Sequence, residues 1–87
     1  MGEFKLSRHV REEMERRSIP LSLLESVLES PQQVVSEWGG KKAYQSQLDF
    51  GDGKIFLLRA IVDQTVNPPI VVTVYRTSKI TKYWRTV

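Results

Sequence analysis

Two arginines occupy positions where a charged side chain is unusual. Arg59 interrupts the apolar run from Ile55 to Val62, where a charge is costly unless it is paired or faces water. Arg76 closes the apolar run that begins at Ile70. Because the guanidinium fork binds phosphate through two parallel hydrogen bonds, two convergent arginines could hold a phosphodiester and neutralise charge that develops during its cleavage. Arg59 and Arg76 are therefore assigned to a candidate catalytic set.

These arginines can act together only if their strands are neighbours and both side chains reach the same face of the sheet. The sequence also allows a structural role, in which Arg59 forms an ion pair with Asp49 or Asp63 on a neighbouring strand. Both alternatives stay open, because either a ligand or a carboxylate would explain a charge in the middle of a strand.

Two further side chains could move protons. Histidine is the side chain suited to proton transfer at neutral pH, and Glu13, four residues after His9 on a predicted helix, could orient the ring of His9. Tyr83 could act as a general acid or base, or as a platform on which a base stacks. The structural alternatives are a histidine that bonds a backbone carbonyl and a tyrosine that belongs to a hydrophobic plug with Trp84. His9 and Tyr83 join the candidate catalytic set, and Trp84 is expected to be buried.

The end of the chain mixes aromatic and basic side chains. From Tyr75 to Val87 there is no acidic residue. Such a mixture grips phosphates and stacks bases, which favours RNA as a partner, although charge alone is equally consistent with a solvated surface. The candidate RNA-binding residues are Lys79, Lys82 and Arg85 in this segment, and Lys54 at the start of a predicted strand.

The composition excludes several kinds of chemistry. The chain has no cysteine and a single histidine, which excludes disulfides, a thiolate nucleophile and cysteine-rich or histidine-rich metal sites. A glycine-rich phosphate loop and a nucleophile elbow are also missing. We therefore expect neither a metal nor a cofactor. Cleavage of RNA by its own 2′-hydroxyl needs only cations and a proton shuttle, so metal-independent RNA cleavage remains possible.

Length and hydropathy bound the organisation of the chain. Its 87 residues suffice for one domain, which we place over residues 1–87. No apolar run approaches the ~20 residues that span a bilayer, and no secretory signal is visible. We therefore expect a cytoplasmic protein that does not associate with membranes.

Two helices are predicted at the start of the chain. Apolar residues recur at helical spacing over 8–17, where Ser7 is a suitable N-cap, and again over 21–29, where Pro20 fits the helix start. The short connection between them predicts a helical hairpin.

Beyond Pro31 the period of the apolar residues changes from 3.6 to two, which is typical of strands. Four strands are predicted, over residues 34–38, 42–50, 54–63 and 70–76. The segment 77–83 is predicted to be a short helix or irregular. The predicted fold class is α+β, with two N-terminal helices packed on a four-stranded antiparallel sheet.

The third predicted strand has two distinct faces. One is wholly apolar and is assigned to the core beneath the helices: Phe56, Leu58, Ala60 and Val62. The other carries Ile55, Leu57, Arg59 and Ile61. A sheet covered on one side leaves the second side free for a ligand. The apolar residues on that second side predict a cover, which would be the C-terminal tail, a second copy or a partner.

Three segments together resemble a known family. They are His9 with Met14 and Arg17-Ser18-Ile19, then Leu24 with Val27-Leu28, Pro31 and Val34, and finally Val72-Thr73-Val74-Tyr75-Arg76-Thr77-Ser78-Lys79-Ile80 with Lys82-Tyr83-Trp84. They resemble a family of small domains of unknown function that is placed beside the RelE/ParE-like toxins of bacterial toxin–antitoxin modules. The resemblance covers nearly the whole chain.

The resemblance implies a RelE/ParE-like fold and a cytoplasmic toxin-like domain. Its activity would be cleavage of mRNA, with the ribosome as a possible partner, and an antitoxin would neutralise it. In RelE-like toxins the functional set is a mid-strand arginine, an arginine on the last strand and a C-terminal tyrosine, which correspond here to Arg59, Arg76 and Tyr83. The lysine-rich strand of RelE itself is weak here, since Lys41, Lys42 and Lys54 stand only at strand starts.

A second interpretation needs no enzyme. A domain of the same fold could bind a protein instead, either an antitoxin or a gyrase-type target, as ParE-like toxins do. A stand-alone domain without a toxin role is the third alternative. Oligomeric state does not follow from the sequence.

Overall fold

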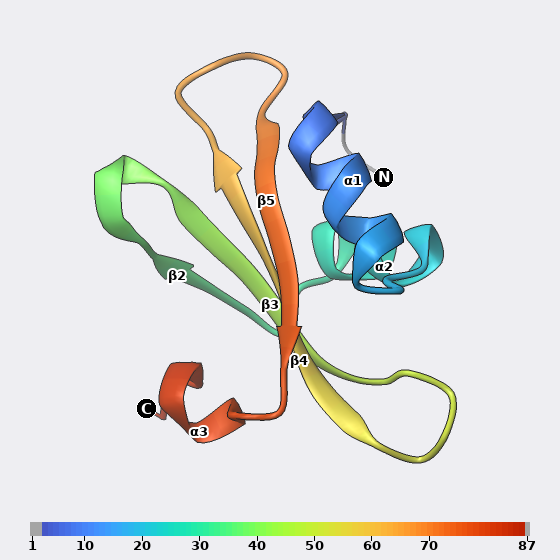
Figure 1. Ribbon diagram of the computed structural model, residues 1–87. Coiled ribbons are helices and arrows are strands. Elements are labelled where there is room, and N and C mark those ends of the chain that lie inside the picture. Colours follow the sequence, from blue (N-terminus) through green and yellow to red (C-terminus); the bar gives the residue numbers. More distant parts are fainter. Residues whose placement is uncertain (1–2, 87) are drawn as a thin grey trace.

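The computed structural model describes residues 3–86, which form a five-stranded sheet with helices on both faces (Figure 1). The strands are β1 (Lys5–Leu6), β2 (Gln33–Ser36), β3 (Lys42–Asp49), β4 (Ile55–Asp63) and β5 (Ile70–Thr77). The helices are α1 (Arg8–Arg16), α2 (Leu21–Glu29) and α3 (Ile80–Tyr83), with a 3-10 turn over Trp38–Gly40. The predicted α+β class, with two N-terminal helices, is confirmed.

The sheet is mixed, not wholly antiparallel. Its order is β1-β5-β4-β3-β2, and β1 pairs with β5 in parallel while the other three pairs are antiparallel. The four-stranded prediction was therefore wrong by one strand. The Lys5 N–H donates to the Pro69 carbonyl at 2.8 Å, and the Ser7 N–H to that of Val71 at 3.2 Å. A strand of two residues is too short to show a period of two, so the sequence pattern did not predict it.

Both N-terminal helices lie close to their predicted positions. Ser7 Oγ accepts the Val10 N–H at 3.1 Å, which confirms the predicted N-cap. The first helix ends at Arg16, after which Ser18 takes a left-handed conformation with φ of 53°. The second helix has its predicted bounds. No helix within residues 3–86 is long and apolar enough to cross a bilayer.

One hydrophobic core joins these two helices to the sheet. Its buried side chains are Val10, Ile19, Leu24, Val27, Leu28, Leu58, Ala60, Val62, Val71 and Val74. Leu58, Ala60 and Val62 were predicted to face this core, whereas Phe56, predicted with them, is only partly buried. Full burial of an aliphatic side chain of this size stabilises a fold by about 1.5–3 kcal/mol. The helix-covered face therefore supplies most of the hydrophobic stabilisation.

The opposite face of the sheet is covered as well. Figure 1 shows α3 on the side of the sheet away from α1 and α2. Leu57 is fully buried and Ile61 is 8% exposed, while Ile55 remains 47% exposed. This side of the sheet is therefore not wholly free, and the cover that its apolar residues predicted is present. Of the three covers considered from the sequence, the C-terminal segment is the one that the structure contains.

The connection between β2 and β3 is a tight turn. The strand predicted over 34–38 ends at Ser36, and Trp38 begins the turn. Gly39 and Gly40 both have φ of 76°, a conformation that residues with a side chain rarely adopt. The Glu37 N–H donates to the Lys41 carbonyl at 2.8 Å and closes the hairpin.

Candidate functional site

Arg59 lies at the centre of a buried polar network on the face covered by α3. Its side chain is 3% exposed, and each of its three nitrogens donates a hydrogen bond. Nε donates to Gln45 Oε1 at 2.8 Å, Nη1 to the Tyr75 hydroxyl at 2.6 Å, and Nη2 to Glu37 Oε2 at 3.0 Å. The charge that was anomalous in the sequence is thus paired with the carboxylate of Glu37.

Tyr83 from α3 stacks over the same guanidinium. Arg59 Cζ lies 4.4 Å from the centre of the Tyr83 ring and 5.8 Å from that of Tyr75. The two rings meet edge to face, with centroids 6.1 Å apart. Cations are attracted to the faces of aromatic rings, so this contact holds α3 against the sheet. The structure therefore brings together Arg59 and Tyr83, two of the four predicted catalytic residues.

Strand pairing explains how the network is assembled. Gln33, Gln45, Arg59 and Tyr75 stand opposite one another on β2, β3, β4 and β5. Residues that face each other across neighbouring strands lie within side-chain contact, so the strand register by itself aligns these four side chains in a row. Gln45 Nε2 then donates to Gln33 Oε1 at 2.8 Å and to the Tyr83 carbonyl at 3.2 Å.

The C-terminal segment is tied down beyond Tyr83 as well. Gln33 Nε2 donates to the Arg85 carbonyl at 2.6 Å, and Gln33 Oε1 accepts the Arg85 N–H at 3.1 Å. One glutamine side chain therefore bonds both backbone groups of Arg85. These two bonds hold the backbone at Arg85 against β2.

A polar cavity of about 360 Å³ opens beside Arg59. Its lining residues are Val35, Glu37, Arg59, Lys82, Tyr83, Trp84 and Arg85. Three of them are cations and one is an acid. Lys82 and Arg85 are exposed, and neither has an acidic partner within ion-pair distance among residues 3–86. The cavity therefore presents a positive surface with one carboxylate at its wall.

The protonation state of Tyr75 follows from its surroundings. Burial raises the pKa of the Tyr75 phenol above its ordinary value of 10.0, although the hydrogen bond and charge of Arg59 act in the opposite direction. The phenol is therefore neutral near pH 7. Its role is to accept the Arg59 hydrogen bond, not to remove a proton from a substrate.

Arg76 does not share this site, contrary to the expectation that both arginines reach one face. Arg59 stands opposite Tyr75, so the next residue of β5 points to the other side of the sheet. Arg76 Cζ lies 4.7 Å from the Phe50 ring centre and 4.8 Å from that of Phe56. Because side chains alternate along a strand, a difference of one residue in register decides the face.

His9 also lies away from the cavity. Its side chain, on α1, is 57% exposed. His9 Nε2 lies 3.5 Å from Thr73 Oγ1 and 3.6 Å from Glu13 Oε1. Both partners face the same ring nitrogen, so this trio cannot pass a proton from one side of the ring to the other. Glu13 itself bonds Arg16 and Arg17.

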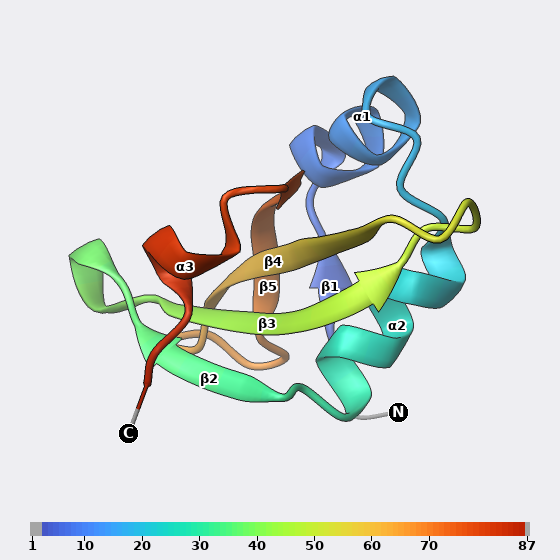
Figure 2. The same ribbon diagram turned by 90° about the horizontal axis from the view of Figure 1, so that it is seen from below.

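The four predicted RNA-binding cations are split by the fold. Lys82 and Arg85 line the cavity. Lys79 precedes α3 and is exposed, with its N–H bonded to Thr77 Oγ1 at 3.0 Å. Lys54 follows the β3–β4 turn, which Figure 2 places at the far end of the sheet from α3. Trp84, expected in the core, is only partly buried and lines the cavity instead.

The sequence interpretation missed Glu37, Gln45 and Tyr75. It named Asp49 and Asp63 as partners of Arg59, but both carboxylates accept hydrogen bonds from residues of the turns that follow them. Asp49 Oδ1 accepts the Gly51 and Gly53 N–H groups, and Asp63 Oδ1 accepts the N–H and hydroxyl of Thr65. The hydrogen bonds from Thr65 lower the pKa of Asp63. Gln45 and Tyr75 could have been found from the register, since they flank Arg59 in adjacent strands.

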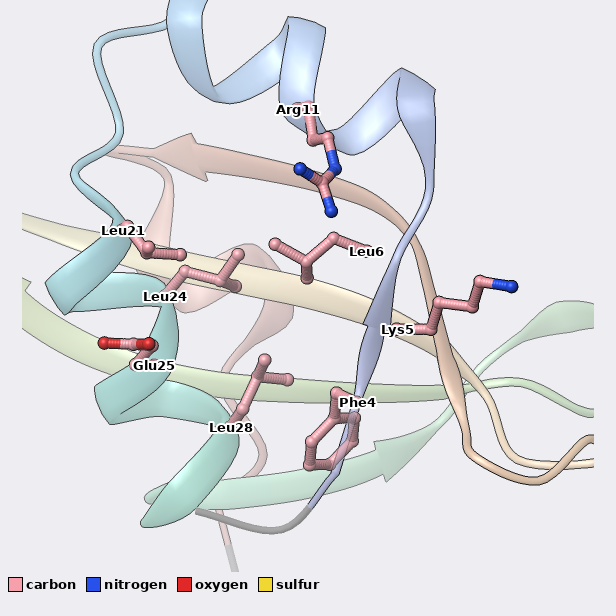
Figure 3. Close-up of a pocket in the computed structure, with 8 residues that line it drawn as sticks. All are labelled: Phe4, Lys5, Leu6, Arg11, Leu21, Leu24, Glu25 and Leu28. Atoms are coloured by element: carbon pink, nitrogen blue, oxygen red, sulfur yellow. The ribbon is translucent and has the colours of Figure 1, made fainter.

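A second hollow lies on the helix-covered side. It is an apolar groove of about 380 Å³ between β1, α1 and α2, and Figure 3 shows the residues that line it. Its lining residues are Phe4, Lys5, Leu6, Arg11, Leu21, Leu24, Glu25 and Leu28. Because its walls are mostly apolar, the groove offers little to a phosphate and more to an apolar segment of a partner.

Among residues 3–86, no group of three or more histidine, aspartate or glutamate side chains is placed to hold a metal ion. Comparison with known families gives one match: a family described as "Domain of unknown function (DUF4258)" matches residues 6–76. No curated protein sequence matches the chain, and no solved structure does. The matched region contains Glu37, Gln45, Arg59 and Tyr75 but ends before α3 begins.

Proposed function

Because the chain belongs to the DUF4258 family of domains of unknown function, its activity must be inferred from its site, and we propose that it binds RNA beside Arg59 and cleaves it without a metal ion. The observation that carries this proposal is the grouping of a carboxylate, a buried guanidinium and a phenol at one positive cavity. Glu37, Arg59 and Tyr83 all line that cavity, with Lys82 and Arg85 beside them.

The chemistry assigns a role to each of these groups. The 2′-hydroxyl of the RNA attacks the adjacent phosphorus, its proton passes to the Glu37 carboxylate, and the bond from phosphorus to the 5′-oxygen breaks. The leaving 5′-oxygen takes the proton of the Tyr83 hydroxyl. The products are a 2′,3′-cyclic phosphate and a 5′-hydroxyl. Proton transfers of this kind typically accelerate a reaction by about 10²–10⁴-fold each.

The cations supply the electrostatic part of the reaction. Three of the five N–H groups of Arg59 are bonded within residues 3–86, which leaves two for a phosphate oxygen. Arg85 and Lys82 add charge from the rim. Fixed cations that face developing negative charge stabilise a transition state without reorganisation. The guanidinium of Arg59, 4.4 Å from the Tyr83 ring centre, also stabilises the phenolate that proton transfer leaves behind.

The same proposal extends to biological role. The order of two helices followed by four antiparallel strands and a C-terminal tyrosine supports kinship with the RelE/ParE-like toxins. On this proposal the domain is the toxin of a toxin–antitoxin module, acts on mRNA in the cytoplasm, and is neutralised by a cognate antitoxin. Arg76 and His9, which the sequence placed in the catalytic set, have no part in it.

The test is protein synthesis in a bacterial cell-free extract, with message integrity read by primer extension in the same tubes. Glu37→Gln keeps a hydrogen-bond acceptor for Arg59, and Tyr83→Phe keeps the ring over it. We expect wild type to produce new 5′ ends and each variant to produce them at least about 100-fold more slowly. Arg8→Gln, an arginine of α1 whose side chain is 93% exposed, is the matched control and should cleave like wild type. Intact messages with wild type would contradict the proposal.

The apolar groove favours a second candidate function, the binding of a protein partner. Leu21 lines this groove and is 50% exposed, although leucine is among the residue types most often buried. An antitoxin segment with large apolar side chains would fit this groove, with Arg11 and Glu25 available at its walls. If the gene adjacent to this one encodes a short protein, the two should copurify, and Leu21→Glu should abolish the complex without affecting RNA cleavage.

A further inference from the structure

Among residues 3–86, Trp38 is the most exposed of the large apolar residues. Its exposed fraction is 91%, compared with 50% for Leu21 and 48% for Val34. An indole in this position contributes almost no burial to the fold, although a tryptophan buries more apolar area than most side chains when it is covered. Stability therefore does not explain its presence at the surface.

The backbone presents this indole from a defined position. Trp38 begins the 3-10 turn, and the glycines that follow it both have φ of 76°. Two hydrogen bonds join the residues before the turn to those after it. The Glu37 N–H donates to the Lys41 carbonyl at 2.8 Å, and Lys42 Nζ donates to Ser36 Oγ at 3.1 Å. The turn is thus closed at its base by hydrogen bonds, which limits the positions that Trp38 can take.

Trp38 adjoins the cavity along the chain. It follows Glu37, whose carboxylate lies 3.0 Å from Arg59 Nη2 at the cavity wall. Successive Cα atoms are about 3.8 Å apart, so the backbone of Trp38 lies one residue from that of a cavity-lining residue. Trp38 is therefore placed to contact a nucleotide next to one whose phosphate lies in the cavity.

A third hollow adjoins the polar cavity along β2. It measures about 440 Å³ and is lined by Val35, Ser36, Arg85 and Thr86. It shares Val35 and Arg85 with the polar cavity, so the two hollows lie next to each other. Arg85, an exposed cation, lines both of them. The two hollows together form the track along which we place a charged, extended chain.

The charges around Trp38 distinguish a nucleic acid from a protein partner. Lys41 and Lys42 follow it in the sequence, and Arg85 and Lys82 lie at the adjoining cavity. The one acid of the turn, Glu37, is paired with Arg59. An exposed aromatic side chain among cations is an arrangement that binds single-stranded nucleic acid, because a base stacks on the ring while the cations hold the phosphates. A protein interface would instead need a contiguous apolar patch.

We infer that Trp38 is a stacking platform that selects single-stranded RNA, with the backbone held along the track that Arg85 lines and a base lying on the indole. The inference rests on the proposed function for the phosphate-binding cavity and adds the substrate class. A base-paired stem cannot offer an unstacked base to Trp38, so duplex RNA is excluded from the track.

The test uses fluorescence anisotropy of labelled oligonucleotides whose 2′-O-methyl groups block cleavage. Three probes are compared: a single strand with bases, the same backbone with abasic positions, and a duplex. Trp38→Ala should weaken binding of the single strand by about tenfold or more, Trp38→Phe by less, and neither should change binding of the abasic strand. Ile55→Ala, at a 47% exposed apolar residue where β4 begins, is the matched control. Equal thermal unfolding temperatures establish that the variants are folded.

Each result separates this inference from the function it rests on. If Arg85→Ala weakens binding of the single strand while Trp38→Ala leaves it unchanged, stacking is refuted and the phosphate site stands. If wild type binds the duplex as tightly as the single strand, the selection for unpaired RNA is refuted. If Trp38→Ala instead abolishes only the complex with an adjacent-gene protein, Trp38 belongs to a protein interface. If wild type binds no probe, the proposed function itself fails.

Discussion

At the scale of single residues, Arg59 organises the chemistry of this domain. Its three nitrogens reach a carboxylate, an amide and a phenol, and its flat face carries the ring of Tyr83. Lysine could not replace it, because a single ammonium group cannot serve partners in three directions and offers no flat face for stacking. The same contacts that fix Arg59 also fix Glu37 and Tyr83, the two groups to which the proposed reaction assigns its proton transfers.

Removing the Arg59 guanidinium should destabilise the fold strongly. In Arg59→Ala the carboxylate of Glu37 and the amide of Gln45 lose their partner, and breaking such a buried pair costs about 3–5 kcal/mol. We expect the lower part of that range, because Glu37 is 33% exposed and water can solvate it. Urea unfolding of wild type and variant measures the difference. A change below about 1 kcal/mol, the size expected of an exposed pair, would contradict the role assigned to Arg59.

At the scale of elements, α3 is the piece whose position depends on a few contacts. It is four residues long and has no buried residue. Its attachment comes from the Arg59–Tyr83 contact and from the bonds that Gln45 and Gln33 make to its backbone and to Arg85. A helix this short is not stable alone, so these tertiary contacts decide whether it forms.

Loss of the Tyr83 ring should release α3 without unfolding the domain. Tyr83→Ala removes a cation–ring contact worth about 0.5–2 kcal/mol, while the core between the two long helices and the sheet is untouched. Trypsin should then cut after Lys79 and Lys82 several-fold faster, with the midpoint of thermal unfolding nearly unchanged. Tyr83→Phe, which keeps the ring, is the control and should be cut at the wild-type rate. Equal cutting of all three proteins would show that other contacts hold α3.

The stability that the first helix contributes depends on pH through Glu13. The hydrogen bond from Arg17, together with the charges of Arg16 and Arg17, lowers the pKa of Glu13 below its ordinary 4.5, although desolvation opposes them. A lowered folded pKa means that the stabilisation is present above about pH 4.5 and is lost as the pH falls through the lower, folded value. Urea unfolding between pH 6 and pH 3 should therefore show a decline in stability that is smaller in Glu13→Gln. Identical pH profiles would contradict this role.

Helices and strands were predictable where the apolar period is long. The two N-terminal helices and the four antiparallel strands each bury a face, so their periods of 3.6 and two are written in the sequence. β1 has two residues and α3 has four, which is too few for a period to show. Both of these short elements form through contacts with distant residues, β1 with Pro69 and Val71 and α3 with Arg59.

The candidate site was predictable only in part. Alternation along β4 placed Arg59 on the face away from the helices, and the aromatic and basic tail indicated Tyr83. The partner Glu37 depends on how the β2–β3 hairpin pairs, and a one-residue difference reverses the face of every side chain. Arg76 was assigned to the wrong face for this reason, because it would share a face with Arg59 only if β4 and β5 paired one residue out of their observed register.

At the scale of the whole molecule, the two faces of the sheet differ. The two N-terminal helices lie on one face and α3 lies on the other (Figures 1 and 2). The first face packs into the apolar core, and the second carries the polar network and the cavity. The chain has a formal net charge of +3, and Lys82 and Arg85, which have no acidic partner among residues 3–86, lie at the cavity. On the proposed function, the net charge attracts RNA to the molecule and these cations hold it at one face.

Binding of single-stranded RNA should depend on salt in proportion to the phosphates held. Each phosphate neutralised on a single strand contributes about −0.7 to the slope of log K against log salt concentration. Contacts from Lys82 and Arg85 predict a slope of about −1.4, which Lys82→Ala should reduce to about −0.7. Titrations at four salt concentrations measure both slopes. A slope near zero for wild type would contradict an electrostatic site at this cavity.

The most direct test of the proposed cleavage is its chemistry on a defined RNA in the presence of EDTA. A single-stranded substrate is compared with one that carries a 2′-O-methyl group at the nucleotide whose phosphate is cut, in an extract if the purified protein needs the ribosome. We predict a 2′,3′-cyclic phosphate and a 5′-hydroxyl on the unmodified RNA, no cleavage of the methylated RNA, and at least about a 100-fold loss of rate in Glu37→Gln. Equal cleavage of both substrates, or of both proteins, would show that the 2′-hydroxyl and Glu37 have no role in the reaction.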